Sequence, residues 1–150
     1  IGWLTCRDPA VAEQLVLAKL NTVISCSVID EFLALEVLRR ADEVLGERRR
    51  LLGTAIADVA RWVERESELI EWVRPDGGAL CCVRLRPDRF NEAGVEAFYR
   101  ELGNHSVLVA NGSWFGEDAR IFRVGFGYPP PDGLAATLDA VSRALHAARG

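Results

Sequence analysis

The amino-acid sequence predicts an α+β fold: a small, mostly antiparallel sheet with helices packed on one face, preceded by a long helix. Two observations carry this prediction. Between residues 79 and 128, segments with strand-like patterns are separated by short turns, which favour antiparallel neighbours over parallel ones. Ahead of them, from Val28 to about Arg65, apolar residues recur with a helical period.

The first helix is predicted to begin after Asp8 and to run to about Leu20. Asp8 can accept hydrogen bonds from the free N–H groups of a helix start, and Pro9 suits the first helical position. Before it, the stretch 1–4 reads as the middle or end of a strand. Because a lone strand is not a natural domain start and the chain has 0 methionines, we expect a fragment of a longer protein.

The long helix is predicted from a stripe of apolar residues that recurs every seven positions. Its members are Leu38, Leu45, Leu52 and Val59. At a rise of about 1.5 Å per residue, one straight helix over 28–65 would exceed roughly 50 Å, which is long for a domain of this size. We therefore expect a bend or break, with Gly46 and Gly53 as the favoured places.

The rest of the chain alternates between strands, helices and turns. The predicted elements are a turn at 75–78, a strand at 79–85, a helix at 91–102, a strand at 106–110, a turn at 111–112, a strand at 120–128 and a helix from about 133. The chain thus divides into a segment 1–27, a long helix within 28–68 and an α+β domain at 69–150.

Composition excludes several functional classes. The chain has 150 residues, 49% of them hydrophobic, so it can bury a core and is not disordered. A net charge of -4 argues against nucleic-acid binding, which needs a basic face. No apolar run approaches the roughly 20 residues that span a bilayer, and no signal-peptide pattern is present. We therefore expect neither a nucleic-acid nor a membrane partner.

The cysteines Cys6, Cys26, Cys81 and Cys82 form no C-x-x-C pair. Adjacent Cys81 and Cys82 should point to opposite faces of a strand. We interpret all four as reduced and buried, which favours a cytoplasmic protein. With two histidines as the only further soft ligands, no metal site is expected.

Arg123 is the candidate binding residue. In the predicted strand 120–128, Phe122, Val124 and Phe126 should face the core. Arg123 would lie on the other face, followed there by two glycines, Gly125 and Gly127, that leave open space beside it. A guanidinium in such a place can hold a carboxylate through two parallel hydrogen bonds, although an ordinary surface ion pair is the alternative.

Other catalytic arrangements are missing. The sequence has no G-x-S-x-G elbow, no Walker loop and no G-x-G-x-x-G fingerprint. His105 and His146 are interpreted as structural or solvent-facing. Lys19 is the only lysine, and its helix offers no prepared pocket, so no lysine of this chain is expected to bind a carbonyl cofactor. No residue of the chain is therefore assigned a catalytic role.

The order of these motifs resembles the C-terminal part of class I/II aminotransferases of fold type I, which depend on pyridoxal phosphate (PLP). The resemblance covers essentially the whole chain. Its motifs are Gly2-Trp3-Leu4, Asn21–Ser27 before a long helix, Pro75-Asp76-Gly77-Gly78-Ala79, Asn111-Gly112-Ser113-Trp114-Phe115-Gly116 and Phe122-Arg123-Val124-Gly125-Phe126. The last two are similar to the family's P-G-x-x-F-G turn and R-[IV]-[SG]-[FL] strand.

The resemblance implies roles for the chain's parts. Residues 1–27 would be a remnant of the large domain with the connecting segment, 28–68 the long interdomain helix, and 69–150 the small domain. Arg123 matches the arginine that grips the substrate α-carboxylate. Ser25 and Ser27 fall in a passage that can lie near the cofactor phosphate across a dimer, without an assigned role. Asn111 replaces a usual proline, which puts the local turn in doubt.

The resemblance also implies properties of the parent protein. It would be a PLP-dependent transaminase, a homodimer that acts on amino acids and 2-oxo acids. Ala79 replaces a common aromatic, which would widen the substrate side. The lysine that binds the cofactor would precede Ile1, so the fragment alone is not expected to be catalytic. The alternatives are a related lyase, acyltransferase or cyclising enzyme on the same scaffold, or a non-catalytic α+β interaction module.

Overall fold

The computed structural model describes residues 1–149, and their contacts divide the chain into two units, 1–47 and the remainder from Arg48. The first unit contains helix α1 (Pro9–Thr22) and helix α2 (Val28–Arg39). Helix α3 (Ala41–Arg65) begins in the first unit and continues into the second. As predicted, the Asp8 carboxylate accepts hydrogen bonds at the start of α1, from the Ala10 N–H at 2.9 Å.

The predicted long helix is two helices, and the expected place of the break was wrong. Arg40 leaves helical geometry with ψ near 22°, so α2 ends there, whereas Gly46 and Gly53 lie inside α3. The Arg40 guanidinium donates to the Glu43 carboxylate at 2.7 Å and 3.0 Å in the first turn of α3. Basic residues that close one helix and acidic residues that open the next suit the two helix dipoles at this junction.

The predicted strand at Ile1–Leu4 is also absent, since residues 1–8 form no strand. A strand requires a neighbour that accepts and donates its ladder hydrogen bonds, and no described segment supplies one to these residues.

The second unit contains a four-stranded sheet in the order β1-β2-β4-β3, with every neighbouring pair antiparallel. The strands are β1 (Ile70–Trp72), β2 (Leu80–Leu85), β3 (Ala110–Asn111) and β4 (Ile121–Gly125). The predicted α+β class with an antiparallel sheet is therefore confirmed. Sequence analysis missed β1, and β3 is much shorter than the strand predicted at 106–110.

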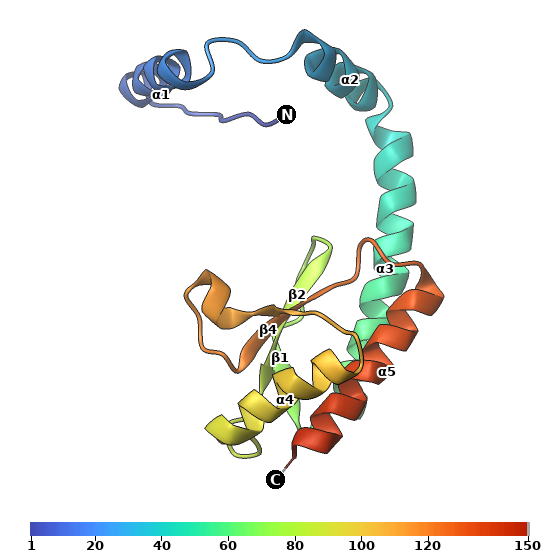
Figure 1. Cartoon of the computed structure of the whole chain (residues 1–150). Helices are drawn as coiled ribbons and strands as arrows, with labels where there is room; N and C mark the ends of the chain where they lie inside the picture. Colours follow the sequence, from blue (N-terminus) through green and yellow to red (C-terminus); the bar gives the residue numbers. More distant parts are fainter. Residues whose placement is uncertain (150) are drawn as a thin grey trace. The chain divides into compact units, whose positions relative to one another are not determined.

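One face of this sheet is covered by helices (Figure 1). Helix α4 (Glu92–Asn104) and helix α5 (Pro131–Ala148) lie on that face in the figure. Along β2 the side chains of Cys81, Val83 and Leu85 are buried, while the intervening residues are exposed. Helices α4 and α5 pack against each other, and α5 also contacts the end of α3, where the Trp62 indole N–H donates to the Ser142 hydroxyl. The core between helices and sheet includes Trp62, Phe98 and Phe122, all at most 1% exposed.

The opposite face of the sheet is open along its middle strands. This arrangement follows from the period-2 alternation of β2 and β4, which places the buried side chains on the helix side and leaves residues such as Leu80 and Arg84 on the open face. Side chains on the bare face can contact a ligand or another protein, and the predicted binding arginine belongs to it.

No helix among residues 1–149 combines the length and apolar character that a bilayer crossing requires.

Candidate functional site

Arg123 lies on β4, on the face of the sheet that the helices leave open. Its neighbours in sequence, Phe122 and Val124, are buried in the core, as the alternation of the strand predicts. The backbone register places Cys82 of β2 directly opposite Arg123 on one side and Ala110 of β3 on the other. Because β4 lies between two strands, ladder hydrogen bonds on both edges fix the backbone that carries the arginine.

The Arg123 guanidinium has no carboxylate partner within residues 1–149. Its Nε is buried and makes no hydrogen bond, the one buried side-chain nitrogen or oxygen of the described chain in that condition. The carbon at the centre of the guanidinium lies 4.0 Å from the centroid of the Phe115 ring, a cation–π contact. A half-buried cation without a counter-ion suits the binding of an anion that arrives from outside.

A short turn positions the Phe115 ring. The turn is the 3₁₀ helix η1 (Gly112–Phe115), capped by the Asn111 side chain, whose Oδ1 accepts a hydrogen bond from the Ser113 N–H at 2.9 Å. Gly116 ends it with a positive φ of 83°, a conformation that favours glycine. Asn111, which replaces the proline typical of the resembled family, therefore caps the start of the turn with its side chain.

Gly112 allows this turn to pack tightly. A Cβ at this position would overlap the carbonyl oxygen of Asp118 and lie 2.8 Å from that of Ile121. The Glu117 N–H also donates to the Gly112 carbonyl at 3.0 Å. The loop between β3 and β4 is thus folded back on the residue that starts η1.

The expected open space beside Arg123 exists at one of the two glycines. Nothing lies within 4 Å of a Cβ built on Gly125, whereas one on Gly127 would overlap the Ala79 side chain. The expectation for Gly127 was wrong because the backbone of this residue lies against Ala79. The Phe126 and Gly127 N–H groups both donate to the Ala79 carbonyl, at 2.9 Å and 3.1 Å.

The two adjacent cysteines of β2 point to opposite faces, as predicted. Cys81 is buried, and burial together with the neighbouring Cys82 raises the pKa of its thiol to about 12. Cys82 is exposed on the open face, across from Arg123. The expectation that all four cysteines are buried was wrong, since Cys6 and Cys82 are exposed.

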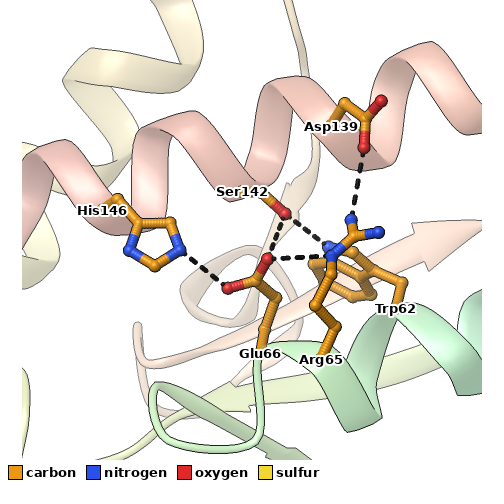
Figure 2. Close-up of polar contacts among 6 residues, drawn as sticks. All are labelled: Trp62, Arg65, Glu66, Asp139, Ser142 and His146. Carbon is orange, nitrogen blue, oxygen red and sulfur yellow. Dashed lines mark hydrogen bonds and ion pairs between the residues drawn. The ribbon is translucent and has the colours of Figure 1, made fainter.

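A second polar cluster joins the end of α3 to α5 (Figure 2). The Glu66 carboxylate, 5% exposed, accepts a hydrogen bond from the Ser142 hydroxyl at 2.7 Å, and its other oxygen lies 2.9 Å from the His146 Nε2. The Trp62 indole N–H donates to the Ser142 hydroxyl at 2.9 Å. Both oxygens of the Glu66 carboxylate have partners, so the cluster links the end of α3 to α5.

Sequence analysis missed Glu66, although a signal was present. Val59, Val63 and Glu66 are spaced as neighbours on one helical face, and the first two belong to the core. A carboxylate that continues an apolar stripe needs buried partners. Ser142 is one partner, and the second is His146, which contacts Glu66 while its own side chain is 58% exposed, in line with the interpretation as structural or solvent-facing.

The remaining candidates lie apart from Arg123 in sequence. Ser27 caps α2 by accepting from the Asp30 N–H at 3.3 Å, and Ser25 and Lys19 are exposed. His105 closes α4. Across residues 1–149, no three histidine, cysteine, aspartate or glutamate side chains gather in a way that could hold a metal ion.

The chain has the fold of the C-terminal, small-domain region of PLP-dependent aminotransferases, which confirms the predicted resemblance. A PLP-dependent aminotransferase from Streptococcus suis matches over 93% of this chain and 36% of its own, with a TM-score of 0.77 and 24% identity. LysN, an α-aminoadipate aminotransferase from Thermus thermophilus, matches over 94% and 36%, with a TM-score of 0.80 and 20% identity.

A third similar structure is the PLP-dependent cyclase OrfR, at 27% identity and a TM-score of 0.76, over 91% of this chain and 36% of its own. The chain therefore spans about 36% of the length of each of these proteins. No family model and no curated protein matches the sequence.

Proposed function

We propose that this chain is the C-terminal part of a PLP-dependent aminotransferase and that Arg123 binds the carboxylate of its amino acid and 2-oxo acid substrates. The observation that carries the proposal is the Arg123 guanidinium on the open sheet face, which lacks an acidic partner within residues 1–149. The fold shared with PLP-dependent enzymes supports the same assignment. In this proposal residues 1–27 and 28–68 connect to a large domain, and 69–150 form the small domain.

Arg123 would orient the substrate and would not transfer protons. A guanidinium stays protonated at any physiological pH and presents its N–H groups in one plane, so it fixes a carboxylate in both position and direction. PLP, when bound, supplies an electron sink for the reacting carbon. Holding the carboxylate rigidly lowers the entropic cost of aligning that carbon for reaction.

In this proposal no residue of this chain binds the cofactor. Lys19 is its only lysine, and that side chain is exposed on α1. The lysine that binds PLP would therefore come from the rest of the parent enzyme. The many exposed apolar side chains of residues 1–47 support contact with such a domain or with a second subunit of a homodimer.

Four free cysteines support a cytoplasmic location.

The test of Arg123 uses the complete protein that contains this chain. Arg123→Lys keeps the charge and loses the two-point grip, so kcat/KM for amino acids should fall by about 10- to 100-fold, largely through KM. Arg84→Lys is the matched control, because Arg84 is an exposed arginine of β2 on the same face and pairs only weakly with Glu71, at 3.7 Å. An Arg123→Lys enzyme with an unchanged KM would contradict the proposal.

A second candidate is a related PLP enzyme, such as a lyase, an acyltransferase or a cyclising enzyme. The observation that favours it is the match to the cyclase OrfR at 27% identity. Both candidates predict a yellow parent protein whose colour borohydride bleaches, and only the first predicts transfer of the amino group to a 2-oxo acid. A colourless parent protein would instead support a non-catalytic interaction module.

A further inference from the structure

No hydrogen bond from its Nε holds the Arg123 side chain in its observed conformation. Its Nε is buried without an acceptor, a state that costs free energy. A surface arginine free to rotate would turn this N–H toward water. The contact that the described residues do supply is the Phe115 ring, 4.0 Å from the centre of the guanidinium. Stacking on the ring therefore offsets the unsatisfied donor.

The stack also determines the direction from which an anion can approach. The central carbon of the Arg123 guanidinium lies over the Phe115 ring, and the N–H bonds that recognise a carboxylate lie in the guanidinium plane. A carboxylate can then bind along the edge, and the negative face of the ring stabilises the cation that holds it. The ring itself is fixed by η1, with Asn111 capping the turn and Gly116 ending it.

We propose that Phe115 is a positioning residue for carboxylate binding: its ring holds the Arg123 guanidinium in place on the open face of the sheet. This inference rests on the proposed role of Arg123 and adds a second residue that sets affinity for the substrate carboxylate. Phe115 acts through Arg123 and does not touch the reacting atoms. Its effect should therefore appear in the binding of every carboxylate, including those that cannot react.

The experiment measures two quantities in the complete protein. One is the dissociation constant of butyrate, a carboxylate without an amino group, by titration calorimetry; the other is the pair kcat and KM for an amino acid. Phe115→Leu removes the ring and should raise both the butyrate dissociation constant and KM by roughly 2- to 30-fold, with kcat nearly unchanged. Phe115→Tyr retains the face of the ring, so its butyrate dissociation constant and its KM should equal those of the unmodified protein.

Two further variants make the test specific. Trp114→Leu is the control, because Trp114 precedes Phe115 in the same turn, is 65% exposed and makes no cation–π contact with Arg123. It should leave both constants unchanged. Pentafluorophenylalanine at position 115 keeps the shape of the ring and reverses its charge distribution, so it should weaken butyrate binding even if Phe115→Leu fails to fold.

The outcomes separate this inference from the proposed function. Arg123→Lys could weaken butyrate binding while Phe115→Leu and the protein with pentafluorophenylalanine at position 115 bind butyrate as tightly as the unmodified protein. In that case the role of Phe115 is refuted and that of Arg123 stands. If Arg123→Lys leaves butyrate binding unchanged, both are refuted. Equal weakening by Trp114→Leu would also refute the inference, because the effect would then belong to the turn as a whole.

Discussion

At the scale of single residues, the loop between β3 and β4 depends on a glycine that has no room for a side chain. The turn that begins at Gly112 lies against the carbonyls of Asp118 and Ile121, and the same turn carries Phe115 toward Arg123. A change at Gly112 should therefore disturb both the local backbone and the placement of Phe115 beside Arg123.

Gly112→Ala should lower the free energy of unfolding by about 1–3 kcal/mol, because the added methyl group forces two backbone carbonyls to move. Urea unfolding followed by circular dichroism measures the change. Gly125→Ala is the control, since a Cβ there meets nothing within 4 Å. Equal stability of the two variants would show that the loop adjusts freely around Gly112.

Tyr99 gives a residue-scale prediction for alkaline pH. Its hydroxyl donates to the Ala119 carbonyl at 2.7 Å, and burial together with the Asp118 charge raises its pKa to about 12. The unfolded phenol ionises near pH 10. The folded state therefore keeps a proton that the unfolded state loses, and stability present below about pH 10 is lost as the pH rises toward 12.

The substitution that tests this is Tyr99→Phe, which removes the titrating group. Unfolding free energies measured by urea at about pH 8 and about pH 11 should fall less steeply with pH in Tyr99→Phe than in the unmodified chain. The variant should also be less stable at pH 8, because the Ala119 carbonyl loses its donor. An identical slope in both proteins would contradict the assigned pKa.

At the scale of elements, the contact between α3 and α5 contains a buried carboxylate in place of an apolar residue. Glu66→Gln keeps the shape and removes the charge that Ser142 and His146 contact. We expect the free energy of unfolding to fall by about 1–3 kcal/mol. Glu64→Gln, a change at an exposed residue in the last turn of α3, should stay within about 0.5 kcal/mol. Thermal unfolding of the two variants measures the difference. Similar midpoint temperatures for Glu66→Gln and Glu64→Gln would contradict a stabilising role of the cluster.

The elements also show how far sequence reasoning extends. Long amphipathic segments such as α5, and strands with strict alternation such as β2, were predicted close to their observed bounds. The face on which Arg123 lies followed from the same alternation. The β1 strand was missed, because three residues are too few to show a period.

Two other features depended on information that the hydrophobic pattern does not contain. The break at Arg40 follows the change from basic to acidic residues, and the expectation based on glycine flexibility placed it in the wrong turns. The stacking of Phe115 on Arg123 joins residues of different elements, so only the folded loop brings it about.

At the scale of the whole molecule, the two units differ in how much apolar surface they bury. The buried hydrophobic residues of the described chain all lie between Val59 and Ala148. Residues 1–47 contain no buried side chain in helices α1 and α2, and large apolar residues such as Trp3 and Phe32 are exposed. The unit from Arg48 onward therefore has its own core, whereas the first unit has none.

Limited proteolysis of the isolated chain should cut within residues 1–47 first and leave a resistant fragment that begins near Arg48. Local opening requires little free energy where few apolar contacts are broken. Mass spectrometry of the products identifies the cut sites. Early cleavage inside the β2–β4 region, with residues 1–47 intact, would contradict the division into units.

The pairing of Cys82 with Arg123 across two strands has a practical consequence. In a chain whose Cys6 and Cys26 are changed to serine, Cys82 is the exposed thiol that remains, since Cys81 is buried and its raised pKa keeps it protonated. An environment-sensitive dye attached there would sit directly across from the candidate carboxylate site. Its fluorescence would report occupancy of that site in real time, independently of any chemical turnover.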